Sequence, residues 1–192
     1  MEGFKVAIDP HYFIAIPLQA SFKECFAKWQ AELKNELSYK QWPHYMDLHI
    51  TLKFLGSVDD SKLQRLKEEL KIIEHNQAFS IDVGGLGTFG NPKNPRVIWV
   101  DVNKTGPLAL LQQKVESQAE NAGFDKENRA YRPHITLAKK WAGDFPSNIS
   151  MEKIKAKFSN VQRMAVEEVV LYQIHPERSV KYEVIENFGL RR

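Results

Sequence analysis

The feature that most constrains this chain is a tetrapeptide that occurs twice. His49-Ile50-Thr51-Leu52 is repeated letter for letter at residues 134–137, close to half of the 192-residue chain further along. Successive side chains of an extended strand point to opposite faces, so the histidine and the threonine share one face and the two aliphatic residues share the other. Each copy therefore predicts a half-buried strand that presents an imidazole and a hydroxyl from one side.

The spacing of the two copies predicts an internally duplicated architecture. Each half of the chain carries its own helices and strands, and no Gly/Ser linker or low-complexity tract separates the halves. We therefore expect a single domain over residues 1–192, built from two interleaved lobes whose motifs face each other. Hairpin-like strand pairs argue against a purely parallel sheet. The expected fold class is α+β: bilobal, with pseudo-two-fold duplicated antiparallel sheets facing across a cleft and helices packed outside.

Hydrophobic periodicity and turn residues place the individual elements. Strands are expected at residues 12–16, 47–54, 79–83, 96–102, 166–174 and 182–188. Helices are expected after the capping residue Ser21, after Asp59 or Asp60, from Pro107, and briefly around residues 154–158. The glycine-rich run 84–90 lacks the Lys-Ser/Thr ending of a phosphate-binding loop, so we expect a turn or bulge where the strand 79–83 ends.

Composition narrows the function classes only slightly. The net charge of +3 permits an anionic partner without requiring one. The single cysteine, Cys25, excludes an intramolecular disulfide, and each motif brings one histidine without a second ligand at metal-binding spacing, so we expect no metal and no cofactor. Residues Met1 to Lys5 do not form a signal peptide, and no stretch approaches the roughly 18 apolar residues of a membrane span. A cytoplasmic monomer without membrane contact is expected.

Two histidines in one cleft can carry out acid–base chemistry. An imidazole with an ordinary pKa of about 6.5 can be neutral while a second holds its proton, so the pair can act as general base and general acid. Phosphodiester transfer suits this arrangement, because the base activates water while the acid protonates the departing alkoxide. The threonine hydroxyls can donate to non-bridging phosphoryl oxygens. Positive charge for an anionic substrate would come from nearby basic residues, namely Lys53, Arg132, Lys139 and Lys140.

The segments 49–56 and 132–139 together resemble the two His-x-Thr-x motifs of the two-histidine phosphoesterase superfamily. Within it, the chain is most similar to the RNA 2′,3′-cyclic phosphodiesterase (2′-5′ RNA ligase) family, and the likeness runs from about Tyr12 to Phe188. Supporting context comes from residues 12–17, 89–90 and 95–99. The resemblance implies metal-free opening of RNA 2′,3′-cyclic phosphates to 2′-phosphomonoesters. Some members of the family also join RNA through a 2′-5′ linkage, the reverse transfer.

The same resemblance implies roles for the motif residues. His49 would donate the proton to the 3′ oxygen and His134 would accept the proton of the attacking water, while Thr51 and Thr136 would hold the phosphoryl group. In related enzymes an aromatic residue and an arginine, each five residues after its histidine, can sandwich the terminal base. The matching residues here are Phe54 and Lys139.

Both members of this base clamp leave a question open. A lysine stacks less well than a planar guanidinium, so Lys139 departs from the family pattern at the second half of the clamp. Strict alternation would also place Phe54 on the face opposite His49. Phe54 therefore either reaches the cleft, because the strand twists or ends there, or belongs to the core.

Two other functions are compatible with the motifs. The chain could be a nucleotide- or RNA-binding module with little turnover, which would bind nucleoside monophosphates without forming product. It could also keep the chemistry and act on a small nucleotide metabolite that carries a cyclic phosphate. Comparing RNA oligomers, mononucleotides and small metabolites, with identification of the product, would separate these alternatives.

Overall fold

The computed structural model describes residues 9–143 and 150–192, so Met1 to Lys5 lie outside the described residues. Within these ranges no helix is long and apolar enough to cross a bilayer. The elements, in chain order, are β1 His11–Pro17, α1 Ala20–Glu36, β2 Tyr39–Gln41, the 3₁₀ helix η1 Tyr45–Asp47, β3 His49–Ser57, α2 Asp60–Leu70, the 3₁₀ helix η2 Lys71–His75, β4 Phe79–Asn91, β5 Asn94–Val102, α3 Gly106–Asn121, β6 His134–Trp141, α4 Met151–Lys157, β7 Val161–Val166, β8 Glu168–Ile174 and β9 Tyr182–Gly189.

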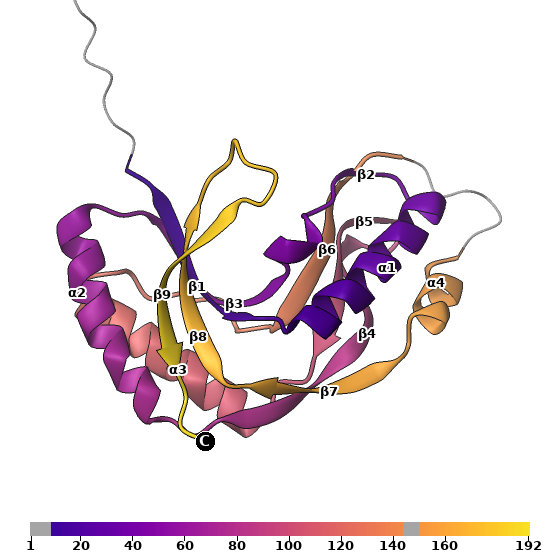
Figure 1. The fold of residues 1–192 in the computed structure, drawn as a ribbon. Helices are drawn as coiled ribbons and strands as arrows, with labels where there is room; N and C mark the ends of the chain where they lie inside the picture. Colours follow the sequence, from indigo (N-terminus) through magenta and orange to yellow (C-terminus); the bar gives the residue numbers. More distant parts are fainter. Residues whose placement is uncertain (1–8, 144–149) are drawn as a thin grey trace, which may run out of the picture.

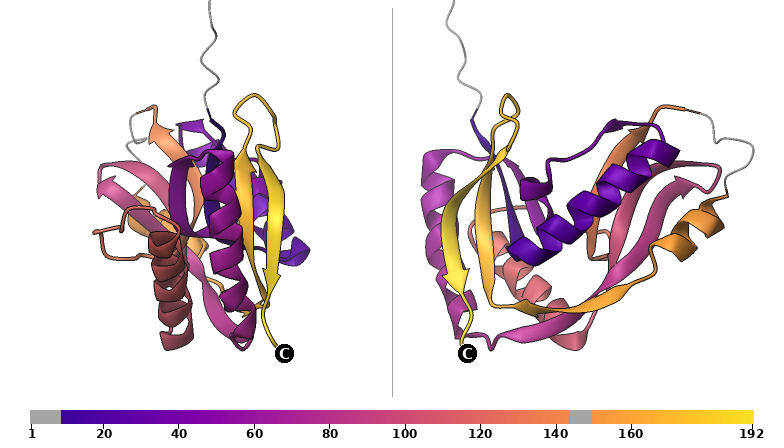
Figure 2. Two further views of the ribbon diagram at one scale, coloured as in Figure 1. Left: turned by 90° about the vertical axis from the view of Figure 1, so that its left-hand side faces the viewer. Right: turned by 45° about the vertical axis from the view of Figure 1, so that its right-hand side comes forward.

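The strands form two antiparallel sheets. The first has the strand order β3-β1-β8-β9, and the second has the order β2-β6-β5-β4-β7. Helices α2 and α3 pack outside the first sheet, whereas α1 and α4 lie beside the second (Figures 1 and 2). The predicted α+β class, with two antiparallel sheets and helices on the outside, is confirmed.

Each lobe takes elements from both halves of the sequence. Helix α1 follows β1 of the first sheet but contacts β6 of the second, and α3 follows β5 of the second sheet but contacts β3 of the first. Strands β8 and β9 then return the chain to the first sheet. Because of this exchange, one large cluster of buried apolar side chains contains residues of both sheets.

Strand β4 differs from its prediction. The strand does not end at Val83 but continues to Asn91, where a two-residue turn leads into β5 at Asn94. A bulge at Gly84 and Gly85 shifts the register between β4 and β5, and the left-handed φ of +77° at Gly85 favours glycine. The prediction of a bulge is confirmed, but the predicted end of the strand is wrong, because the bulge bends the strand without stopping it.

Other element boundaries also differ from those predicted from the sequence. Residues 166–174, expected as one strand, are divided at Glu167 between β7 and β8, because the chain passes there from the second sheet to the first. Ser21 is not the cap of α1, since Gln19 occupies that position. Asp59, one of the two expected capping residues, caps α2. Helix α3 begins at Gly106, one residue before the predicted Pro107, and Thr105 caps it.

Strand β1 is buried on both faces, which explains its unbroken apolar sequence. One face joins the main core, whereas Phe13 and Ala15 on the other face form a small cluster with Val170 and Tyr172. Phe13 also contacts the ring of His49, with ring centroids 4.7 Å apart. The first motif strand is therefore supported by aromatic packing on the neighbouring strand.

Close packing of β4 against β5 gives a first prediction. Gly87 lies opposite Trp99, and a Cβ atom at Gly87 would lie 2.2 Å from the indole ring. We expect Gly87→Ala to displace the indole and lower the free energy of unfolding by about 1–3 kcal/mol in urea denaturation. Gly106→Ala is the matched control, because nothing lies within 4 Å of the added atom. Equal stability of the two variants would contradict this account.

Candidate active site

The two motif strands carry the same irregularity at the same position. In β3, Thr51 pairs with Ala15 of β1 and Lys53 pairs with the adjacent Ile14, so Leu52 is an extra residue. In β6 the extra residue is Leu137, because its two neighbours pair with adjacent residues of β5. Such a bulge shifts the alternation of the side chains that follow it.

The bulges decide which side chains reach the cavity between the sheets. After each bulge, the fifth residue beyond the histidine returns to the face of the histidine and the threonine. Phe54 is accordingly 66% exposed, so the alternative that placed it in the core is wrong. A cavity of about 900 Å³ is lined by side chains from both motifs, namely His49, Thr51, Phe54, His134, Thr136 and Lys139.

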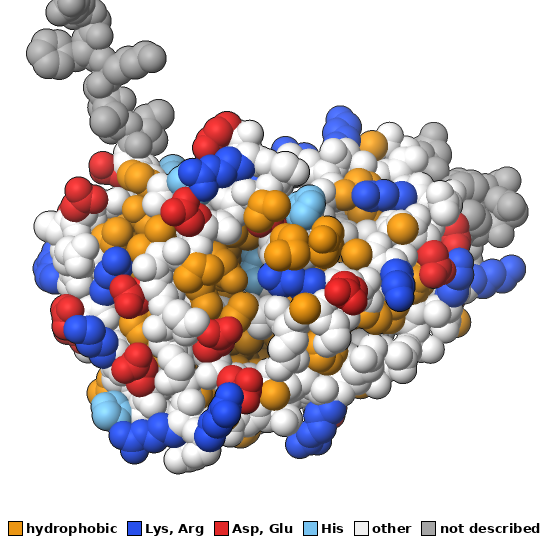
Figure 3. Space-filling model, in the orientation of Figure 1, with side chains coloured by type: hydrophobic (Ala, Val, Ile, Leu, Met, Phe, Trp, Pro, Cys, Tyr) orange, Lys and Arg blue, Asp and Glu red, His pale blue; other side chains and the backbone are white. Residues whose placement is uncertain are grey.

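This cavity lies where the two lobes meet. Strands β3 and β6 belong to different sheets and contact each other. On the face shown in Figure 3, apolar side chains gather in the middle of the molecule, with a histidine among them and charged side chains around them. The cavity volume is near the upper end of the roughly 300–1,000 Å³ of small-molecule sites. It can therefore hold more than a reacting phosphate group.

Both histidine rings are held in the same way. Nδ1 of His49 lies 2.7 Å from the carbonyl oxygen of Asp47, and Nδ1 of His134 lies 2.7 Å from the carbonyl oxygen of Arg132. A carbonyl can only accept a hydrogen bond, so Nδ1 is the donor in both rings and Nε2 of a neutral ring is an acceptor. Nε2 of His49 lies 3.0 Å from Oγ1 of Thr51, which donates to it.

The surroundings of the rings disfavour their charged forms. The pKa of His49 is lowered to about 4, chiefly by burial. The charges of Lys139, His134 and Lys23 act in the same direction, and the hydrogen bond to the carbonyl oxygen of Asp47 opposes them. Burial and Lys139 also lower the pKa of His134. Both imidazoles are therefore neutral at neutral pH, and a bound anion would raise both pKa values.

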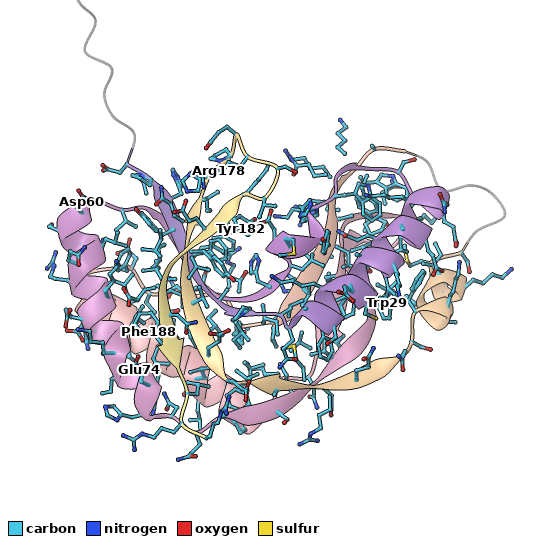
Figure 4. All side chains as sticks on the ribbon, viewed as in Figure 1. Trp29, Asp60, Glu74, Arg178, Tyr182 and Phe188 are labelled. Atoms are coloured by element: carbon cyan, nitrogen blue, oxygen red, sulfur yellow. The ribbon has the colours of Figure 1, made fainter. Side chains whose placement is uncertain are left out.

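Aromatic rings pack against both histidines. Tyr182 meets the ring of His49 edge-on, with centroids 5.2 Å apart, and it lies near the middle of the molecule where β9 begins (Figure 4). Phe89 meets the ring of His134 in the same way at 5.0 Å, and it stacks on Trp99. Each imidazole therefore packs against an aromatic ring of its own sheet: Tyr182 and His49 belong to the first sheet, and Phe89 and His134 belong to the second.

The expected basic residues have different surroundings. Lys139 lines the cavity, and burial together with the charges of Lys140 and Lys181 lowers its pKa. Arg132 also lines the cavity, and its backbone carbonyl orients His134. These two residues remain candidates for binding an anionic substrate.

Lys53 has a different partner from the one expected. Its ammonium group forms an ion pair with Glu116 of α3 and donates to the carbonyl oxygen of Asp125 at 2.8 Å. Only 4% of the side chain is exposed. Because the carboxylate of Glu116 balances its charge, Lys53 is not retained among the residues that supply charge to a substrate.

Several residues of the site were not predicted from the sequence. Tyr182 and Glu116 come from parts of the chain outside the motifs, and Asp47 lies just before the first motif; no short motif marks any of the three. The carboxylate of Asp47 is buried and accepts hydrogen bonds from the backbone N–H groups of Lys181 and Tyr182, which holds the start of β9 beside the first motif. Among residues 9–143 and 150–192, no group of three or more His, Cys, Asp or Glu side chains is arranged to hold a metal ion.

Comparison with known proteins agrees with the duplicated geometry. The family model of the LigT-like phosphoesterases matches the chain twice, at residues 16–99 and 100–182. An RNA 2′,3′-cyclic phosphodiesterase of Bacillus subtilis is 37% identical over 188 residues, which cover 95% of this chain and 98% of that protein. One from Geobacillus stearothermophilus is 35% identical over 94% of this chain, but the chain spans only 57% of its length.

Solved structures share the fold. A crystal structure of Escherichia coli LigT complexed with 3′-AMP has a TM-score of 0.79 at 24% identity, and the match covers 95% of this chain and 99% of that one. A further phosphoesterase structure has a TM-score of 0.76 at 25% identity, covering 96% and 99%. The solved structures thus show the same fold, and the two matches to the family model, with the Bacillus subtilis relative at 37% identity, show that the chain belongs to the LigT-like phosphoesterase family.

Proposed function

We propose that this protein hydrolyses RNA 2′,3′-cyclic phosphodiester ends to 2′-phosphomonoesters by acid–base catalysis with two histidines. The observation that carries the proposal is the pairing of two equivalent imidazoles in one cavity. Each ring is anchored through Nδ1, and each is accompanied by a threonine that lines the same cavity. The names of the relatives, RNA 2′,3′-cyclic phosphodiesterases, support the choice of substrate.

In the proposed reaction, Nε2 of His134 accepts a proton from water as the water oxygen forms a bond to phosphorus. The bond between phosphorus and the 3′ oxygen breaks, and His49 donates a proton to that oxygen. Thr51 and Thr136 donate hydrogen bonds to the non-bridging oxygens. One proton is taken up and one is released, so the products are a 2′-phosphomonoester and a free 3′ hydroxyl.

His49 has to become protonated when the substrate binds. Its pKa of about 4 leaves the ring neutral at neutral pH. The negative charge of a bound phosphodiester favours the imidazolium form, and displacement of the Thr51 hydroxyl toward the phosphate frees Nε2 to hold the proton. The acid is thus formed in the complex, while His134 is already a neutral base.

Residues around the catalytic pair are proposed to bind the nucleotide. Phe54 offers an exposed aromatic face for the terminal base, and Lys139 and Arg132 offer positive charge. Because the two histidines can supply both proton transfers, the proposed mechanism requires no metal ion. A monomeric state and a cytoplasmic location remain predictions from the sequence.

Removal of either imidazole tests the proposal. His49→Ala and His134→Ala should each lower kcat for a 2′,3′-cyclic-phosphate oligonucleotide by roughly 10²–10⁴-fold, the usual worth of general acid or base catalysis. His11→Ala, an exposed histidine that does not line the cavity, is the control and should retain full activity. The measurement is product formation by chromatography, with assignment of the phosphate to the 2′ position.

Three results would contradict the proposal. Tight binding of nucleoside monophosphates without any product would identify a binding module. Product formation from small nucleotide metabolites alone would identify a different substrate. Loss of wild-type activity in EDTA would rule out the metal-free mechanism.

The lowered pKa values predict the dependence on pH. The profile of kcat/KM reports groups of the free enzyme, so both limbs of its bell should lie below the ordinary histidine pKa of about 6.5. Lys139 lowers both histidine pKa values, so Lys139→Met should move the bell to higher pH. Lys139→Arg keeps the charge and should leave the bell in place. An unshifted profile in Lys139→Met would contradict the electrostatic role of this lysine.

A further inference from the structure

One wall of the cavity consists of chain without regular secondary structure. Residues 125–132 connect the end of α3 to the second motif, and every one of them lines the cavity. Such a segment has no ladder of backbone hydrogen bonds to fix its position, so other contacts must hold it. The wall carries basic side chains at Lys126, Arg129 and Arg132, of which Arg129 is paired with Glu127 on the wall itself.

The two residues of a buried ion pair hydrogen-bond to the backbone at the start of this wall, at Asp125 and Glu127. Lys53, on the first motif strand, donates to the carbonyl oxygen of Asp125 at 2.8 Å. Glu116, on α3, accepts a hydrogen bond from the backbone N–H of Glu127, also at 2.8 Å. Lys53 and Glu116 are ion-paired with each other, and their side chains are 4% and 10% exposed. The pair thus clamps the wall backbone at two points.

Comparison of the two motifs shows that this clamp breaks the pseudo-symmetry. Lys53 and Ala138 both stand just after the extra residue of the bulge, and both are buried. The apolar Ala138 shows that the position does not require a charge for the strand to form. Burying an ion pair removes two charges from water, and apolar replacements of similar volume are often equally stable. Fold stability alone therefore does not account for Lys53 and Glu116.

We propose that Lys53 and Glu116 are positioning residues that hold the wall 125–132 to bind the sugar-phosphate chain of the substrate beyond its terminal nucleotide. This inference rests on the proposed function. Lys126 lies between the two clamped residues, Asp125 and Glu127, and its ammonium group suits a phosphate of an RNA chain. A clamped wall presents this group without the entropy cost of ordering a free loop. Both side chains of the pair also line the cavity, but the proposed role of the pair is exerted through the wall that it holds.

The test replaces the whole pair by apolar residues. Lys53→Met combined with Glu116→Leu leaves no unpaired buried charge, so the melting temperature should stay close to that of the wild type. Hydrogen exchange of the Glu127 amide should become faster, because its acceptor is lost. For a cyclic-phosphate oligonucleotide, KM should rise roughly tenfold, the equivalent of about one lost hydrogen bond, with kcat within about twofold. KM for a mononucleotide 2′,3′-cyclic phosphate should change much less.

A control variant distinguishes a positioning role of the pair from a general effect of losing an ion pair, and a binding measurement tests the inference independently of the proposed catalytic function. Lys71→Met breaks the exposed pair between Lys71 of η2 and Glu68 of α2 and should leave both KM values unchanged. The Kd of a 2′-phosphate-ended oligonucleotide, measured by fluorescence anisotropy, should rise in the double variant whether or not the wild type turns over. Unchanged KM and Kd, or equal rises for oligonucleotide and mononucleotide, would overturn the inference. If the double variant fails to fold, Glu116→Gln should still raise Kd, and its failure to do so would also overturn the inference.

Discussion

At Leu52 in β3 and at Leu137 in β6, one extra residue shifts the alternation of side chains. Before the bulge, the histidine and threonine share the cavity face, and after it the fifth residue joins them. Without the bulge, Phe54 and Lys139 would point away from the histidines, because side chains alternate with a period of two. The local backbone of two strands therefore brings the residues proposed to bind the nucleotide to the same face as the proposed catalytic histidines.

The two motif histidines are anchored in the same way, but their surroundings differ. Both imidazoles donate from Nδ1 to a backbone carbonyl and both contact an aromatic ring edge-on. Only the first motif has a lysine that leads to α3, and only the second is preceded by the wall 125–132. If the two histidines serve as acid and base, as proposed, these unequal surroundings give a substrate a means to distinguish them.

The sequence predicted the parts that depend on local pattern. The repeated tetrapeptide indicated two equivalent strands, and apolar spacing on α3 placed its buried face correctly at Leu108, Leu111, Val115 and Ala119. It could not indicate the bulge in either motif, because one extra buried residue leaves the apolar pattern looking continuous. Nor could it indicate the partner of Lys53, since Glu116 is brought to it only by the exchange of helices between lobes. Contacts of this kind follow from topology, not from spacing.

The central claim is that both motifs act on one phosphoryl group. A crystal structure with a bound nucleoside 2′-phosphate tests it most directly. The account predicts hydrogen bonds from the phosphate oxygens to Nε2 of both His49 and His134 and to the hydroxyls of Thr51 and Thr136. A phosphate that contacts only one motif, or that binds to the basic side chains of the wall 125–132 away from the histidines, would contradict it.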